Sequence, residues 1–342
     1  MEEEQSEPPS NNGLRAVTLK QQDIFQSAFS NLSQPIAEYS FANIFIWTTA
    51  LKLYWKRIHS HLCIFANGKD LVLATPPVPE FGATKEGFLQ AISESFEIME
   101  RYNNGSIVPR IEYASDEMLE KIHESCNSLN LGAQPLHSDY IYPRENMITL
   151  SGGSLKSKRQ LKSRFLREHP DAYTKELTDD QIPACLELLN LWKERADENH
   201  EGQVTEDGRD IATNVLRGKE YNACEVALKF YKELKLIGMT VHCDEQVIGF
   251  TLGEQISPLQ ASILVEKTHP DYNGCPQFIF SEFCKVWTDC PEINVGDDWG
   301  IPTLRWTKES YRPSRRLNKY VLNLEKCAKK EELPIFAGNI NG

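Results

Sequence analysis

A short basic segment at residues 155–169 carries the first side chains that could do chemistry. It holds six Lys or Arg against one Glu, a formal charge of 6 − 1 = +5. Gly152-Gly153-Ser154 precedes it, and a flexible turn that enters a helix leaves backbone N–H groups free to bind an anion. The segment is either an ordinary solvated helix face or a phosphate site, and the candidate residues of that site are Gly153, Lys158, Arg159 and Lys162.

A second basic segment lies at residues 305–320. It also holds six Lys or Arg against one Glu, and its first two cations are Arg305 and Lys308. If the two segments converge in space, they form one electropositive groove on an acidic protein. Such a groove concentrates a polyanion at one place by electrostatic focusing.

Two pairs of neighbouring residues could handle a proton or an amine. Asp297 and Asp298 follow a predicted strand and precede a predicted helix, so they either cap that helix or act on a substrate proton. Glu266 and Lys267 end another predicted strand, where they form either an ion pair at the rim or a pair that faces the substrate. Tyr311, within the second basic segment, and Lys267 are candidates for stabilising an oxyanion.

Gly274 lies in a short loop between a predicted strand at 261–267 and a predicted helix at 276–288. Acyltransferases of the GNAT type use this order of strand, loop and helix to place a pyrophosphate on a helix N-terminus. Here Cys275 and Pro276 follow the glycine, and the proline removes one N–H donor. The loop is therefore either a phosphate site or simply a helix start with proline in its first turn.

The overall composition is that of a globular protein, with 342 residues and a formal charge of −12. The acidic balance argues against a general nucleic-acid coat but leaves room for one local basic site. Nine singly spaced cysteines, an acidic N-terminus and the lack of a long apolar run predict a cytoplasmic protein without a transmembrane helix. The histidines show no metal-ligand spacing, so no metal site is predicted. No Walker loop or nucleophile elbow is present.

The elements that would position these residues divide into two lobes, because a single core rarely extends beyond roughly 250 to 300 residues. In the first lobe, strands at 62–66 and 71–74 flank an Asn-Gly hairpin turn, and a strand at 136–142 completes the lobe. In the second lobe, strands at 234–243, 246–255 and 261–267 form an antiparallel meander. A capping box of Thr178 and Gln181 begins a helix.

The predicted domain organisation follows from these elements. It comprises a disordered acidic tail at 1–13, lobes at 14–142 and 143–325, and a C-terminal tail at 326–342. The later lobe carries most of the candidate residues.

Several short motifs in combination resemble one known family. They are YSFANIFIW at 39–47, DYIY at 139–142, LSGG at 150–153, Lys158-Arg159, IGFTLGE at 248–254, Glu266-Lys267, Gly274, Asp298-x-Gly300-Ile301, Leu304-Arg305, Lys308 and Ser310-Tyr311-x-Pro313. Over residues 20–320 the chain resembles the phosphatidylglycerol lysyltransferase C-terminal-like family. The resemblance implies an α+β fold with two GNAT-like mixed-sheet lobes in tandem. It also implies attack of an acceptor hydroxyl or amine on an aminoacyl ester of tRNA.

The leading hypothesis is a transferase that moves an aminoacyl or acyl group from a carrier to a lipid head group or a small-molecule acceptor. The expected carrier is aminoacyl-tRNA, used as a co-substrate, and no tightly bound cofactor is expected. We assign Lys158, Arg159, Arg305 and Lys308 to the donor phosphates, with Gly153, Lys162 and Gly274 as further phosphate candidates. Glu266, Asp297 or Asp298 would orient or deprotonate the acceptor.

Two alternatives remain. An acyl-coenzyme A-dependent N-acyltransferase is favoured by the strand, loop and helix around Gly274 and disfavoured by Pro276. A member of the fold that binds a charged ligand without turnover is favoured by departures from the family pattern. These are Gln160 in place of Asn, and Val295-Gly296 in place of Arg-Glu.

Overall fold

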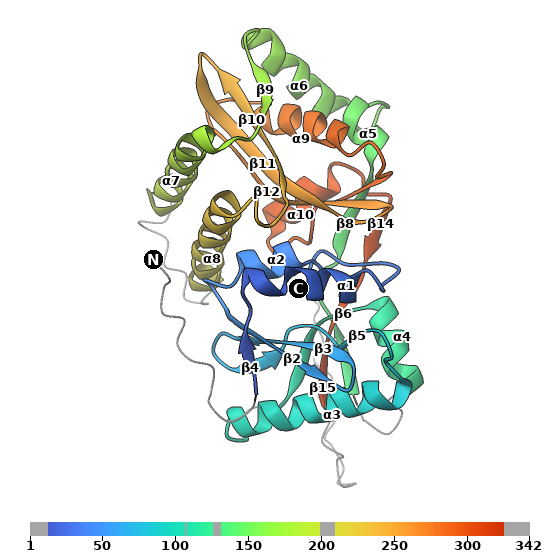
Figure 1. The fold of residues 1–342 in the computed structure, drawn as a ribbon. Helices are drawn as coiled ribbons and strands as arrows, with labels where there is room; N and C mark the ends of the chain where they lie inside the picture. Colours follow the sequence, from blue (N-terminus) through green and yellow to red (C-terminus); the bar gives the residue numbers. More distant parts are fainter. Residues whose placement is uncertain (1–12, 107, 126–130, 199–208, 325–342) are drawn as a thin grey trace, which may run out of the picture.

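The computed structural model describes residues 13–106, 108–125, 131–198 and 209–324. Its chain forms two mixed sheets, one above the other in Figure 1, with helices between and around them. The tails predicted at 1–13 and 326–342 lie outside the described residues, apart from Gly13. Residue 325 lies outside them as well.

The first sheet has the strand order β1-β2-β3-β4-β6-β15-β7, and β5 pairs with β3. The strands are β1 (Arg15–Ala16), β2 (Lys52–Ile58), β3 (His61–Asn67), β4 (Leu71–Leu73), β5 (Val78–Pro79), β6 (Arg110–Ser115), β7 (Leu131–Pro135) and β15 (Lys319–Leu324). Antiparallel pairing of β3 with β4 confirms the predicted hairpin. One parallel contact, between β4 and β6, makes the sheet mixed.

The second sheet has the order β14-β8-β13-β12-β11-β10-β9. Its strands are β8 (Asp139–Pro143), β9 (Tyr173–Glu176), β10 (Ile237–Cys243), β11 (Gln246–Ser257), β12 (Gln260–Thr268), β13 (Glu292–Asn294) and β14 (Arg315–Leu317). The antiparallel run of β10, β11 and β12 confirms the predicted meander. Parallel pairing of β12 with β13 covers only the first three residues of β12, so among the described strands the second half of β12 has no partner on that side.

The two sheets exchange strands. The strand predicted at 136–142 was expected to complete the first lobe, but β8 pairs with β13 and β14 in the second sheet. Conversely, β15 pairs with β6 and β7 in the first sheet, although its residues fall in the range predicted for the second lobe. Pairing between strands far apart in the chain leaves no local mark in a sequence, which is why this placement was wrong. The lobe boundary at 142/143 stays a prediction.

The helices are α1 (Gln22–Phe29), α2 (Phe41–Ile46), α3 (Lys85–Tyr102), α4 (Asp116–Ser125), α5 (Arg144–Thr149), α6 (Lys156–Glu168), α7 (Ile182–Glu198), α8 (Arg209–Lys229), α9 (Cys275–Val286) and α10 (Pro302–Glu309). Short 3-10 turns, η1 (Leu19–Gln21) and η2 (Asp179–Gln181), precede α1 and α7. The capping box predicted for Thr178 and Gln181 is present at η2. In Figure 1, α5, α6 and α9 lie on one side of the second sheet, and α7 and α8 lie on the other. Within the described part of the chain, every helix is too short or too polar to cross a lipid bilayer.

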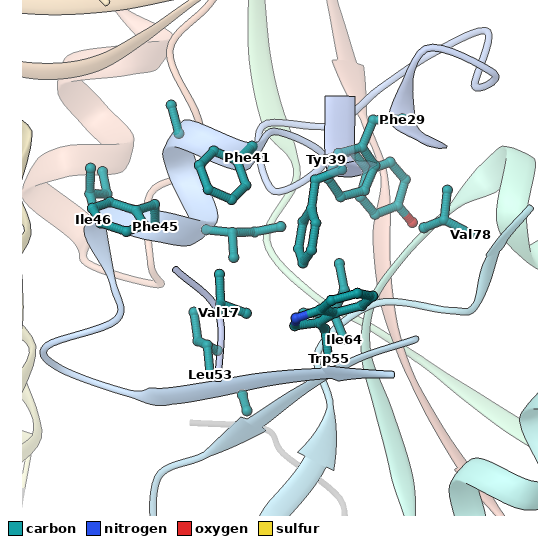
Figure 2. Packing of buried hydrophobic residues seen from close by; sticks show 14 of the residues in the cluster. Val17, Phe29, Tyr39, Phe41, Phe45, Ile46, Leu53, Trp55, Ile64 and Val78 are labelled. Atoms are coloured by element: carbon teal, nitrogen blue, oxygen red, sulfur yellow. The ribbon is translucent and has the colours of Figure 1, made fainter. Parts of the chain in front are cut away.

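The main hydrophobic cluster joins the two sheets through α2. Figure 2 shows Phe41 and Tyr39 above Trp55 of β2, with the ring of Phe29 stacked on Tyr39 at 5.9 Å between centroids. On the other side of α2, Phe45 meets Phe230, after α8, edge to face at 5.5 Å. Because large rings pack the space between the sheets, the position of one sheet fixes that of the other.

Gly274 is a point where only glycine fits. It has a left-handed φ of +94°, and a Cβ atom there would lie 2.3 Å from the backbone oxygen of Leu161 in α6. Gly153, in contrast, has open space around its Cβ position and an ordinary φ. The close approach of α6 to the start of α9 therefore depends on Gly274.

We expect Gly274→Ala to lower the free energy of unfolding by about 2 kcal/mol or more, from the left-handed backbone and the backbone clash together. Gly153→Ala is the matched control and should change it by less than about 0.5 kcal/mol. Denaturant unfolding followed by circular dichroism measures both. Equal stability of the two variants would contradict the close packing of α6 on α9.

Candidate functional site

A fully buried lysine lies where the two sheets meet. The ammonium of Lys319, at the start of β15, is 2.6 Å from Glu38, 2.8 Å from Asp139 and 2.5 Å from Asp297. The Lys319 side chain has no exposed surface. We call these four residues the Lys319 cluster. One cation among three carboxylates leaves the cluster short of positive charge.

The members of the Lys319 cluster come from four separate segments, and further hydrogen bonds fix them. Asp139, the first residue of β8, accepts from the backbone N–H of Ala37 at 2.7 Å and from the amide of Asn294 at 3.0 Å. Burial raises the pKa of Glu38 to about 7, against the opposing effect of Lys319. Burial also acts to raise the pKa of Asp139, but Lys319 and these hydrogen bonds bring it below its usual value. The cluster therefore holds ionised Asp139 against Lys319.

Asp298, next to this cluster, is engaged on both oxygens. It accepts from the Tyr140 hydroxyl at 2.6 Å, from Arg305 Nε at 2.9 Å and from the backbone N–H of Gly300 at 2.8 Å. Although burial acts against it, these donors lower the pKa of Asp298 to about 2. The loop that carries it turns through left-handed residues at Gly296, Trp299 and Gly300. A carboxylate this well satisfied is a poor base, and Arg305 is occupied in holding it.

Lys308 stabilises the same loop by hydrogen bonds to its backbone. Its ammonium donates to the backbone oxygens of Val295, at 2.6 Å, and Asp297. Burial lowers the pKa of Lys308 to about 8. Lys308 thus fixes the loop rather than presenting a charge to solvent.

Lys158 lies against aromatic rings and is 6% exposed. Its ammonium lies 4.5 Å from the ring centroid of Tyr311 and 5.6 Å from that of Trp306, which is 70% exposed. Within the described ranges, that ammonium makes no hydrogen bond or ion pair. Burial lowers its pKa. A cation held by ring faces without an anion is ready to receive one.

Glu266 is the second buried group with unmet bonding capacity. Its Oε2 is buried and has no hydrogen-bond partner among the described residues. Burial raises the pKa of Glu266 to about 8, despite neighbouring Lys267. The charge of Glu266 in turn raises the pKa of Tyr311, after burial the largest contribution to that shift. Tyr311 therefore contacts Lys158 and lies within reach of the charge of Glu266, and we call these three residues with Trp306 the Tyr311 site.

Lys267 does not belong to this site, because successive strand residues point to opposite faces of a sheet. Its ammonium pairs with Glu220 of α8 at 2.7 Å and lies 5.4 Å from the ring centroid of Trp192 in α7. Glu266 and Lys267 are thus not a substrate-facing pair, and Lys267 forms an ion pair on the α7–α8 side.

The remaining candidates of the first basic segment have structural contacts. Arg159 donates to the backbone oxygens of Leu150 and Gly152, at the end of α5. Lys162 donates to Ser281 Oγ at 2.7 Å and to Glu282 at 2.9 Å, which ties α6 to α9. Gly153 is exposed, whereas Gly274 lies under α6.

The two basic segments meet where Lys158 contacts Trp306 and Tyr311. Most other cations of the second segment are paired, Arg315 with Glu292 and Arg316 with Glu309, both at 2.6 to 2.7 Å. The structure thus brings Lys158 onto Tyr311, and it joins Asp298 to Arg305 and Lys308 to the loop of Asp297 in a second network.

Sequence reasoning missed Glu38, Asp139 and Trp306. Asp139 stood in the DYIY motif and Glu38 immediately before the 39–47 motif, but neither position indicates a partner for a lysine far along the chain. Trp306 stood beside Arg305 in the second basic segment. An aromatic residue among cations is a usable signal for a binding surface.

A comparison with protein families finds a match over residues 29–323 to the family described as phosphatidylglycerol lysyltransferase, C-terminal. The chain belongs to this family. The match spans the whole second sheet, the first sheet apart from β1 and the last residue of β15, and every residue of the Lys319 cluster and the Tyr311 site. No curated protein matches the chain.

Three solved structures share the fold. A conserved protein of unknown function from Bacteroides thetaiotaomicron is 23% identical, with a TM-score of 0.77 over 92% of this chain and 99% of that one. The C-terminal domain of a putative lysylphosphatidylglycerol synthetase from Agrobacterium fabrum is 13% identical, with a TM-score of 0.58 over 90% and 93%. L-PGS from Bacillus licheniformis is 13% identical, with a TM-score of 0.59 over 91% and 93%. The predicted α+β class is confirmed, with two mixed sheets, and the family supports a transferase of the acyl or aminoacyl type.

Removal of the central cation tests the Lys319 cluster. Lys319→Met leaves three buried carboxylates without it, so we expect a loss of about 3 to 5 kcal/mol in unfolding free energy at neutral pH. The loss of unfolding free energy should be smaller at low pH, because protonation of the three carboxylates removes their unpaired negative charge. Lys229→Met is the control, since Lys229 pairs with Glu225 at the surface and such pairs contribute about 0 to 1 kcal/mol. A Lys319→Met protein as stable as this control would show that the cluster does not join the sheets.

Proposed function

We propose that the protein transfers an aminoacyl group from aminoacyl-tRNA to the amine or hydroxyl of a small molecule or a lipid head group. One observation carries the proposal. The Lys158 ammonium lies over the ring of Tyr311 without an anion among the described residues, and Glu266, whose buried Oε2 has no partner there, acts on Tyr311 by its charge. Desolvated groups left unpaired lower stability, so a ligand that satisfies them gains affinity.

The proposed reaction needs positioning and proton transfer but no covalent enzyme intermediate. The acceptor nitrogen or oxygen forms a bond to the ester carbonyl carbon, and its proton passes to the Glu266 carboxylate. The bond between that carbon and the ribose oxygen then breaks, and the ribose oxygen takes the proton from Glu266. Tyr311, whose pKa burial raises, stays protonated and donates to the oxyanion.

The donor end fits the side of the site formed by α6. Lys158 is assigned to the terminal phosphate of the donor, and Lys156 and Arg167 of the same helix are exposed. Trp306 offers an exposed ring beside Lys158, on which a base can stack. We do not propose that Arg159, Arg305 and Lys308 contact the donor, because each of these side chains donates hydrogen bonds to other groups of the protein.

Acyl-coenzyme A is a less suitable donor. In the GNAT order of strand, loop and helix the pyrophosphate binds at the N-terminus of the helix, which corresponds here to α9. That N-terminus is covered by α6, whose Leu161 oxygen lies against Gly274, and Pro276 in its first turn lacks an N–H. The contact that makes Gly274 necessary thus occupies the place of the pyrophosphate.

Glu266→Gln tests proton transfer. A base must be ionised, so the rate of aminoacyl transfer should rise with pH through about 8, the raised pKa of Glu266. Glu266→Gln should lower the rate by about 10² to 10⁴-fold and abolish that rise. The measurement is mass gain of lipid and small-molecule acceptors incubated with charged tRNA. Transfer by Glu266→Gln at the wild-type rate would refute the role.

The same variant has a stability signature. Folding raises the pKa of Glu266 from 4.5 to about 8. The contribution of the protonated Glu266 carboxyl to stability is therefore complete below pH 4.5 and is lost as the pH rises through about 8. Glu266→Gln should therefore be more stable than the wild type at pH 9 by a margin that vanishes at pH 5. This separates a folding defect from a chemical one.

Lys158→Met tests the donor. If Lys158 contacts a donor phosphate, the variant should bind aminoacyl-tRNA more weakly and reduce the log–log salt slope of binding by about 0.7 to 0.9. Lys232→Met is the control, since Lys232 pairs with Asp179 by the start of α7. Acetyl-coenzyme A should not compete with the tRNA. An unchanged slope for Lys158→Met would overturn the assignment, and tRNA binding without transfer would favour the ligand-binding alternative.

A further inference from the structure

The turn that follows α6 lies against the turn between β10 and β11. The backbone N–H of Asp244, in the β10–β11 turn, donates to Oδ2 of Asp171 at 2.7 Å. His169 caps the C-terminus of α6, two residues before Asp171, and Cys243 is the last residue of β10. Side chains that can bind a metal ion therefore gather from two segments, and we call His169, Asp171, Cys243 and Asp244 the Cys243 cluster.

The sulfur of Cys243 is the centre of this cluster. It lies 3.5 Å from Oδ2 of Asp171 and 3.8 Å from Nδ1 of His169. Ligand atoms of Asp171, Cys243 and Asp244 all lie within 4.8 Å of one another. Around a tetrahedral zinc ion, a thiolate sulfur lies about 3.5 Å from a nitrogen or oxygen ligand, since the bonds to the metal are about 2.3 and 2.1 Å long. The sulfur thus has two partners of different type at the separation that one shared ion needs.

Packing holds the imidazole of His169 toward the sulfur. Its ring centroid lies 5.2 Å from that of Phe165 and 4.9 Å from that of Tyr272. Cys243 is 1% exposed and belongs to a hydrophobic cluster with Phe165. Because the apolar contacts fix both the thiol and the imidazole, these two ligands are oriented before an ion binds.

The Cys243 cluster is acidic and has no lysine or arginine partner. Among the described residues, neither Asp171 nor Asp244 forms an ion pair with a lysine or arginine, which includes Arg167 and Lys175, the cations nearest to Asp171 in the sequence. The backbone N–H of Asp244 lowers the pKa of Asp171 most, and the charge of His169 lowers it as well. Two carboxylates and a thiol beside one imidazole leave a negative charge that a divalent cation can balance.

Without a metal the Cys243 thiol keeps its proton at neutral pH. Burial raises the pKa of Cys243 to about 11, and the hydrogen bond to Asp171 and the charges of Asp171 and Asp244 add to this rise. A metal ion binds the thiolate, so it must displace that proton. Binding at this cluster should therefore release a proton, whereas binding to exposed carboxylates alone should not.

We propose that the Cys243 cluster binds one Zn²⁺ ion. The sulfur of Cys243 and Nδ1 of His169 are ligands that zinc prefers, and carboxylate oxygens of Asp171 and Asp244 complete the tetrahedron. The S–H bond breaks, its proton passes to water, and the sulfur forms a bond to the ion. The ion ties the end of α6, the helix that carries Lys158, to the second sheet.

Ligand spacing in the sequence does not indicate this site, because Asp171 and Cys243 are 72 residues apart. The inference is independent of the transfer reaction, since the Cys243 cluster and the Tyr311 site share no residue.

Titration of the full chain with Co²⁺ tests the site, because cobalt can replace zinc and its absorption reports the ligands. After treatment with a chelator, we expect one Co²⁺ per chain, with a dissociation constant of about 10 μM or less and the visible bands of a tetrahedral ion. A thiolate-to-cobalt charge-transfer band should accompany them, and one equivalent of Zn²⁺ should remove both. Isothermal titration in two buffers of different ionisation enthalpy should show the release of one proton per ion.

Two ligand variants and a matched control locate the ion. Cys243→Ser should abolish the charge-transfer band and the proton release, and His169→Gln should weaken Co²⁺ binding by about tenfold or more. His269→Gln is the control, since His269 also packs on Tyr272, at 5.3 Å between centroids, but accepts from the backbone N–H of Asp271. It should bind Co²⁺ within about twofold of the wild type.

Absence of the tetrahedral spectrum at about 1 mM Co²⁺, a hundredfold excess over the expected dissociation constant, overturns the proposal. The same charge-transfer band in Cys243→Ser overturns it as well. Binding without that band and without proton release would show an exposed carboxylate site only, and it also contradicts the proposal. Should Cys243→Ser fail to fold, the comparison of His169→Gln with His269→Gln and the proton release decide the outcome.

Discussion

The Lys319 ammonium holds together segments that the chain order keeps far apart. Its three carboxylate partners come from before α2, from the start of β8 and from the loop after β13. Burial of one cation with several anions is unfavourable unless every group finds a partner, so the geometry of the cluster is strongly constrained. A shift of either sheet would separate charges in a medium that screens them poorly. The relative position of the sheets is therefore fixed by electrostatics as well as by the rings around α2.

The loop after β13 carries this constraint to the Tyr311 site. Asp297 binds Lys319, Asp298 binds Tyr140 and Arg305, and Lys308 binds the loop backbone from α10. Trp306 lies on α10 between those last two cations, and Tyr311 follows shortly after. Asp297, Asp298, Arg305 and Lys308 look most like a polar active site, but they stabilise this loop. The loop and α10 in turn orient the rings of Trp306 and Tyr311, which contact Lys158.

Several parts of this arrangement could be predicted from the sequence. Local patterns were sufficient for the β3–β4 hairpin, the β10–β12 meander and the capping box at Thr178, because turn chemistry and alternation lie within a few residues. Family motifs indicated Lys158, Glu266 and Tyr311. Charge in the sequence was less informative, since Arg159 and Lys308 satisfy backbone oxygens and Lys267 points to the opposite face from Glu266. Which anion a cation meets depends on contacts between distant segments, and no local pattern records them.

The exchange of strands between the sheets has a consequence for biosynthesis. In the first sheet β15 lies between β6 and β7, and among the described strands β7 pairs only with β15. A ribosome delivers β15 after every other strand that the structure describes, so the first sheet stays open until residue 324 has been made. Domains usually fold in order as they emerge. Here the N-terminal half must wait for the C-terminal strand, and Lys319, the first residue of that strand, brings the buried carboxylates their cation in the same step.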